Sequence, residues 1–161
     1  MSRHYLLNRE TRANTGFTDL FVVTHADLTE ATDNTDQTLT LDALAFGDVV
    51  GYEALIEIVT AFDASGVSAD NACTVALGVT GATTQIIGAS AIAAAGAGTA
   101  AYTAYATAAG GSPYVTPTGG KNLLLTVDVT DADGALADYT TGELWIWIKI
   151  IRRADRAMGQ K

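Results

Sequence analysis

The chain has 161 residues, of which 48% are apolar and 17% charged, a composition typical of one folded domain and not of a disordered segment. The net charge of −9 is concentrated in residues 14–148, which hold sixteen acidic side chains and one Lys or Arg, Lys121. An acidic body repels phosphate backbones and anionic lipids at long range, so neither nucleic acid nor a membrane is expected as a partner.

The two ends of the sequence are basic. Cationic side chains gather in the first 13 residues and again from residue 152, and our candidates for contact with a partner are Arg3, Arg9, Arg12, Arg152 and Arg153. We expect an N-terminal arm over residues 1–16, a β-sandwich domain over 17–151 and a basic tail over 152–161. Three roles stay open for these ends: docking on an acidic protein, docking on a neighbouring copy, or no role beyond solvation.

Period-two alternation of apolar residues between turn signals predicts strands at residues 18–28, 37–44, 48–62, 73–80, 83–90, 121–130 and 142–151. In residues 48–62, one face carries Ala54, Ile56 and Ile58 after Tyr52. The other face alternates acidic and aliphatic residues. This pattern is typical of a strand with one side in a core.

Residues 71–120 contain no Asp, Glu, Lys, Arg or His, and much of the stretch is Ala, Gly and Thr. A membrane span is disfavoured because Ala and Thr contribute little to insertion, and two central glycines weigh against a long helix. We expect a long connection and a further strand near residues 100–107, where Tyr102 and Tyr105 are candidates for contact with a partner. A charge-free surface is tolerated when another protein covers it, although a compact loop over the chain's own sandwich fits as well.

About eight short strands without a convincing amphipathic helix predict an all-β protein, a single jelly-roll-like antiparallel β-sandwich with extended terminal arms. Hairpin and Greek-key connections give the same pattern, so the strand order stays open. Cys73 lies among apolar residues and is expected to be buried. One thiol makes no intrachain disulfide and the N-terminus lacks the apolar run of a secretory signal, so we expect folding in the cytoplasm.

The motifs of common enzyme and metal sites are absent from the sequence. His4 and His25 have no Cys or second His at ligand spacing, and no phosphate-binding glycine loop or Gly-x-Ser-x-Gly elbow occurs. We therefore assign no catalytic, cofactor-binding or metal-binding residue. Residues 131–138 loosely resemble a calcium loop, but the spacing fails after Asp133, which favours an Asp-Gly turn.

The strand predicted at 142–151 carries two tryptophans on its outward side. Alternation places Leu144, Ile146 and Ile148 on a core face and Trp145 and Trp147 on the opposite face. Three explanations stay open for the indoles: cover by the chain's own loop or arm, burial against another subunit, or a platform that stacks on sugars.

The order of these segments resembles the jelly-roll decoration (cement) proteins of tailed-phage heads, over residues 18–153. The likeness rests on the order of a first strand near residues 19–29, a long strand at 52–66, the segment 75–90, the Ala/Gly/Thr-rich insert, the segment 113–130 and the terminal "GELWIWIKIIR". The resemblance implies a homotrimer, the major capsid protein as partner, a place on the outside of the capsid in the virion, and no catalysis. It also implies stabilisation of the shell by bridging capsid subunits.

Two other functions compete with this hypothesis. One is a carbohydrate- or receptor-binding β-sandwich on a phage tail or fibre, which would use the tryptophan face or the acidic loops. The other is an enzyme, most plausibly a glycan hydrolase, which the lack of a recognisable constellation makes the weakest candidate.

Overall fold

A computed structural model describes residues 2–64, 73–91, 101–105, 114–115, 121–129 and 134–153. The described strands are β1 (Arg3–Leu6), β2 (Asp19–Thr24), β3 (Gln37–Ala43), β4 (Val49–Asp63), β5 (Cys73–Val79), β6 (Ala82–Ala91), β7 (Ala101–Tyr105), β8 (Tyr114–Val115), β9 (Asn122–Val129) and β10 (Thr141–Ile151). Helix α1 spans Arg9–Thr15, and two short 3-10 helices cover His25–Asp27 and Leu136–Asp138.

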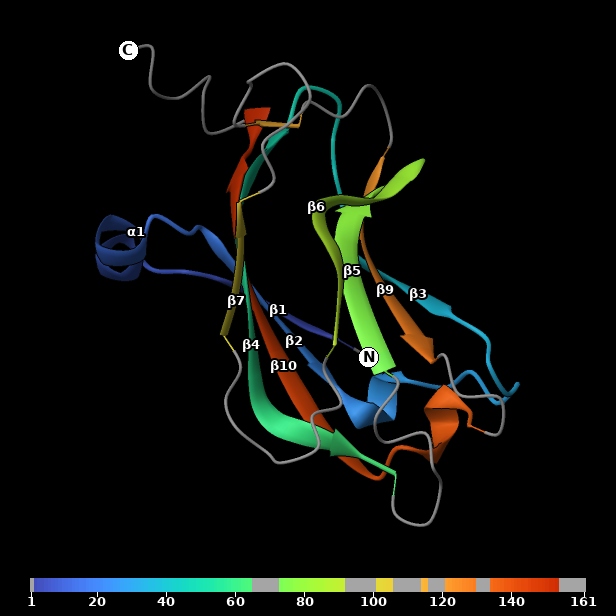
Figure 1. The fold of residues 1–161 in the computed structure, drawn as a ribbon. Helices are drawn as coiled ribbons and strands as arrows, with labels where there is room; N and C mark the ends of the chain where they lie inside the picture. Colours follow the sequence, from blue (N-terminus) through green and yellow to red (C-terminus); the bar gives the residue numbers. More distant parts are fainter. Residues whose placement is uncertain are drawn as a thin grey trace, which may run out of the picture.

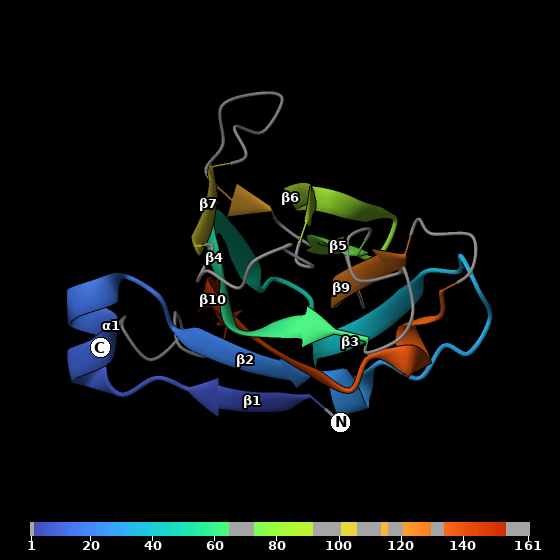
Figure 2. The same cartoon turned by 60° about the horizontal axis from the view of Figure 1, so that its bottom comes forward.

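The strands form two antiparallel sheets that face each other (Figures 1 and 2). In the larger sheet, which we call sheet A, the order is β1-β2-β10-β4-β7, and β8 also pairs with β4. In the smaller one, sheet B, the order is β3-β9-β5-β6. Apart from the pairs β1–β2, β5–β6 and β7–β8, consecutive strands lie in opposite sheets. The orders β2-β10-β4-β7 and β3-β9-β5-β6 are those of a jelly roll. The all-β jelly-roll-like prediction is confirmed, and the structure supplies the strand order.

The core fills the space between the two sheets. Alternation along β10 buries Leu144, Ile146, Ile148 and Ile150, and alternation along β4 buries Ala54, Ile56 and Ile58, as predicted. Sheet B contributes the buried side chains Cys73, Val75, Leu77, Ile86, Ile87, Leu123, Leu125 and Val127. The expectation that Cys73 is a buried apolar residue is confirmed.

Residues 2–16, expected to form an arm, contain a strand and a helix. Strand β1 pairs with β2 and so adds an edge strand to sheet A. Helix α1 begins at Asn8, whose side chain accepts a hydrogen bond from the Thr11 backbone N–H (2.8 Å), and it ends at Gly16 in the left-handed conformation (φ 78°). None of its residues is buried, and it projects beside the sandwich in both views (Figures 1 and 2).

Several predicted segments extend beyond the described residues. The Ala/Gly/Thr-rich stretch is described only where β6 ends and where β7 and β8 lie. The Asp-Gly turn at 133–134 and the tail after residue 153 also fall partly or wholly outside the described part. Among the described residues, no helix is long and apolar enough to cross a bilayer.

Candidate functional site

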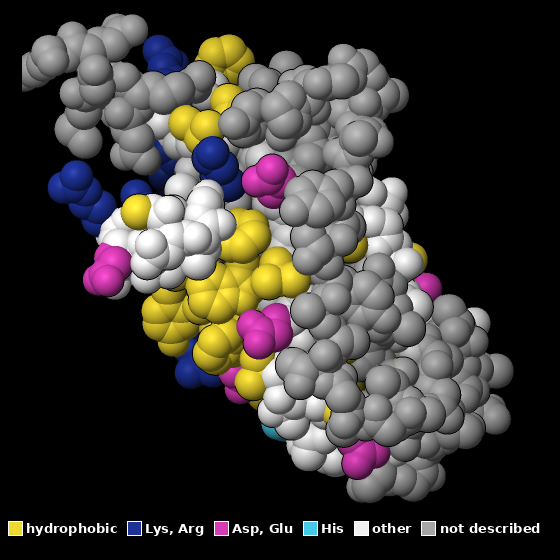
Figure 3. Space-filling view, turned by 60° about the vertical axis from the view of Figure 1, so that its left-hand side comes forward, with side chains coloured by type: hydrophobic (Ala, Val, Ile, Leu, Met, Phe, Trp, Pro, Cys, Tyr) yellow, Lys and Arg dark blue, Asp and Glu magenta, His cyan; other side chains and the backbone are white. Residues whose placement is uncertain are grey.

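The outer face of sheet A presents apolar side chains to solvent. Because β1, β2, β10 and β4 are neighbours in register, their outward residues line up in rows across the sheet. We call this surface the indole face. It comprises Arg3, Tyr5, Leu20, Leu55, Glu57, Glu143, Trp145 and Trp147, together with Val22, which is itself buried (4% exposed). Figure 3 shows hydrophobic side chains gathered on this side of the molecule, with acidic groups beside them. An apolar sheet face of this kind is typical of a surface that another molecule covers.

The two indoles lie at the middle of the indole face. Both are half-buried, with ring centroids 5.9 Å apart and an interplanar angle of 64°. Trp145 Nε1 donates to Glu143 Oε1 (2.5 Å), and Trp147 Nε1 donates to Glu57 Oε2 (3.3 Å). Because the chain's own carboxylates satisfy both indole N–H groups, the exposed parts of the rings are left for apolar contact.

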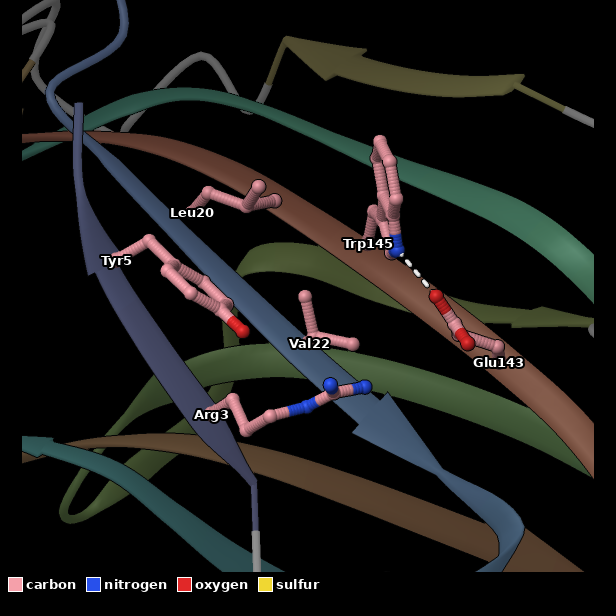
Figure 4. A pocket seen from close by; sticks show the side chains of 6 residues that line it. All are labelled: Arg3, Tyr5, Leu20, Val22, Glu143 and Trp145. Atoms are coloured by element: carbon pink, nitrogen blue, oxygen red, sulfur yellow. Dashed lines mark hydrogen bonds between the residues drawn. The ribbon is translucent and has the colours of Figure 1, made fainter. Parts of the chain in front are cut away.

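A shallow hollow lies between β1 and β10 on the same face. Its volume is about 250 Å³, and Figure 4 shows that Leu20 and Val22 of β2 form its floor. Arg3 and Tyr5 of β1 stand on one side, and Trp145 and Glu143 of β10 stand on the other (Figure 4). Tyr5 is 45% exposed, so an aromatic ring and a guanidinium group are accessible beside an indole.

A polar cluster ties both ends of the described chain to the sandwich. The fully buried carboxylate of Asp19 bonds His4 Nε2 (2.8 Å) and Arg152 Nη1 (3.0 Å), and it also accepts from the Thr18 hydroxyl. Arg152 Nη2 reaches Asp42 at 2.7 Å. The His4 ring also stacks on Phe21, with centroids 4.3 Å apart. The cluster therefore ties β1 to β2, and it ties the segment after β10 to β2 and β3.

The basic residues proposed as contact points lie in different settings. Arg152 is held by Asp19 and Asp42, whereas Arg153 donates its backbone N–H to Asp48 Oδ1 (2.8 Å). The remaining candidates have exposed side chains, on β1 for Arg3 and on α1 for Arg9 and Arg12. Only Arg3 lines the hollow.

The tyrosine candidates lie on β7 at the far side of β4. The backbone register places Tyr102 opposite Ile56 and Tyr105 opposite Glu53. The side chains of β7 lie outside the described part of the structure.

We also searched the described residues for a group of side chains that could bind a metal ion. They contain no group of three or more His, Cys, Asp or Glu side chains placed to hold a metal ion. Asp138 caps a short 3-10 turn, where its Oδ2 accepts from the Ala135 backbone N–H (3.1 Å). Residues 130–133, and with them the calcium question, lie outside the described residues.

The polar cluster is the feature that sequence reasoning missed. Its one local signal is Asp19, which shares the inward phase of β2 with Phe21 and Val23. A carboxylate on the core side of a strand needs partners, because an unpaired buried charge is costly. The identity of those partners, His4 and Arg152, depends on contacts between segments distant in the sequence.

Neither a protein-family model nor a curated protein matches the sequence. Among solved structures, a chain in one described as "Cyanophage Pam1 capsid asymmetric unit" is similar to this chain with a TM-score of 0.51 and 17% sequence identity. The match covers 83% of this chain and 81% of that chain. At this identity the likeness shows the fold alone, over about four fifths of each chain.

Proposed function

We propose that this chain is a structural protein of a phage virion that binds the outer surface of the capsid and stabilises the shell by bridging capsid subunits. The observation that carries the proposal is the jelly-roll fold shared, over 83% of this chain, with a chain of a phage capsid structure. The proposal assigns the protein a binding role and no catalytic step, with the major capsid protein as its partner.

The indole face supports this role because it offers apolar area at the centre and charge at the margin. Interfaces are enriched in Trp, Tyr and Arg, and all three types stand on this face. A protein that binds the assembled lattice and not free subunits stabilises the lattice by mass action. Self-association would strengthen binding, because several identical weak contacts act together. A trimer is the stoichiometry that the family resemblance implies.

Co-sedimentation with purified capsids of the parent phage that lack this protein tests the proposal. We expect the wild-type chain to pellet with the capsids and to raise the temperature at which they release DNA. Trp145→Ala and Trp147→Ala should each raise the dissociation constant by about thirtyfold, which corresponds to about 2 kcal/mol for an interface tryptophan.

Phe46→Ala is the matched control, because Phe46 is an aromatic side chain 67% exposed in the β3–β4 connection, outside the indole face. This variant should bind as the wild type does. A wild-type chain that stays in the supernatant at every concentration would refute the proposed function. If all three variants bind as tightly as the wild type, the attachment site does not include the indoles.

A further inference from the structure

We propose that two copies of this chain pair face to face through their indole faces, about a two-fold axis that runs parallel to the strands between β2 and β10. This inference does not rest on the capsid role. It rests on the order of charges and shapes across sheet A.

One row of outward residues carries a cation on β1 and an anion on β4, and it continues beyond β4 to Ala101 of β7. The register places Arg3 of β1 beside Val22 of β2, Val22 beside Trp145 of β10, and Trp145 beside Glu57 of β4. The row therefore runs from a cation, through two apolar side chains, to an anion. Such a row is complementary to its own reverse.

The adjacent row is apolar from β1 to β4. It runs from Tyr5 through Leu20 and Trp147 to Leu55. From β1 to β4 the two rows make a patch with apolar side chains in the middle, a cation on β1 and an anion on β4. Glu143 of β10 adds a second carboxylate, which bonds Trp145 and lines the hollow. Electrostatic complementarity of this kind selects a partner and fixes its orientation.

A two-fold axis parallel to the strands reverses the strand order of the partner. The β1 margin of one protomer then lies over the β4 margin of its partner, so that Arg3 meets the partner's Glu57 and Glu57 meets the partner's Arg3. At the same time β10 lies over the partner's β2. An isologous contact requires a patch that is complementary to itself, and these rows meet that requirement.

The shape of the surface agrees with the charges. The hollow of about 250 Å³ lies over β2, and the indoles stand on β10. Under the same axis the indole of Trp145 in each protomer lies over the floor formed by the partner's Val22. Two sheets can stack in this way with their strands aligned to within about 30°.

Sedimentation equilibrium of the full chain, with charge-reversed variants, tests the pairing. Within one protomer Arg3 and Glu57 are three strand spacings apart, about 14 Å, which is too far for an ion pair. Any charge rescue between them must therefore come from a second copy. Arg3→Glu and Glu57→Arg should each raise the dissociation constant at least about tenfold, because each places like charges opposite one another.

An equimolar mixture of the two single variants should restore association, because both contacts between the unlike protomers then join opposite charges. The double variant should also associate with itself. Asp36→Arg is the matched control: it makes the same charge change as Glu57→Arg at an exposed residue beside β3, in sheet B, and it should leave association unchanged. Circular dichroism establishes that each variant is folded.

Dimers, or hexamers made of two paired trimers, that dissociate in the single variants and return in the mixture support the inference. A wild-type chain that is monomeric up to the highest soluble concentration overturns it. A trimer that is the largest species and is insensitive to these charge reversals also overturns it, as does a mixture that fails to associate better than either variant alone. Pairing and capsid attachment use the same face, so a paired chain must dissociate before its indole face binds the shell. The pairing is measured without capsids, and its failure is therefore distinguishable from the failure of the proposed function.

Discussion

Replacing Asp19 by Asn should destabilise the protein strongly, because this carboxylate joins three segments at once. Asp19 is fully buried and bonds Arg152, His4 and Thr18. Asn keeps the size of the side chain but removes its charge and one of its two acceptor oxygens. Arg152 and His4 then face a neutral amide in a site from which water is largely excluded.

The magnitude follows from the partners that remain. A hydrogen bond to a charged group contributes about 1.5–3 kcal/mol, and breaking a buried ion pair costs about 3–5 kcal/mol. Because the Arg152 side chain is 26% exposed and keeps Asp42, we expect the lower end, about 3 kcal/mol. For a domain of this size that loss lowers the melting temperature by about 6–12 °C.

Thermal and urea unfolding at pH 7, followed by circular dichroism, measure the change in the free energy of unfolding. Asp42→Asn is the control, because this carboxylate bonds the same arginine but is 22% exposed, and its pair should be worth about 1 kcal/mol or less. If the Asp19 variant loses no more stability than the Asp42 variant, the cluster does not hold the ends of the chain as described.

The packing of sheet B leads to two further predictions. Gly78→Ala should lower the free energy of unfolding by about 3 kcal/mol or more, because a Cβ at this position would lie 2.2 Å from the Ala82 carbonyl oxygen. At Gly88 a Cβ meets no atom within 4 Å, so Gly88→Ala is the control and should leave the urea unfolding curve nearly unchanged. Burial raises the pKa of the Cys73 thiol to about 12. A thiol reagent at pH 8 should therefore label Cys73 only after unfolding, and equally fast labelling of the native protein would contradict this burial.

The sequence predicted the elements whose pattern is local. Along β4 and β10, aliphatic residues recur at every second position, and this period determines which side chains enter the core. The outward phase of Trp145 and Trp147 follows from the same period. A period of two is imposed by the strand backbone itself, so a single segment is enough to reveal it.

Features that depend on distant segments were beyond this reasoning. All four residues of β1 are exposed, so no apolar alternation marks them, and the strand is held through its pairing with β2. The bond between Arg152 and Asp19 joins residues 133 positions apart. Its arginine was expected to belong to a solvated tail or an interface, because the charge of a segment does not reveal which carboxylate it meets in the fold.

The position of β10 in sheet A has a consequence for biosynthesis. This strand lies between β2 and β4, yet it is the last of the described strands to emerge from the ribosome. Until it arrives, the strands on either side have unpaired edges and the inward side chains of both stay uncovered, a state prone to aggregation. Production of the recombinant protein should therefore benefit from slow synthesis at low temperature and from holdase chaperones that cover those edges until the final strand is inserted.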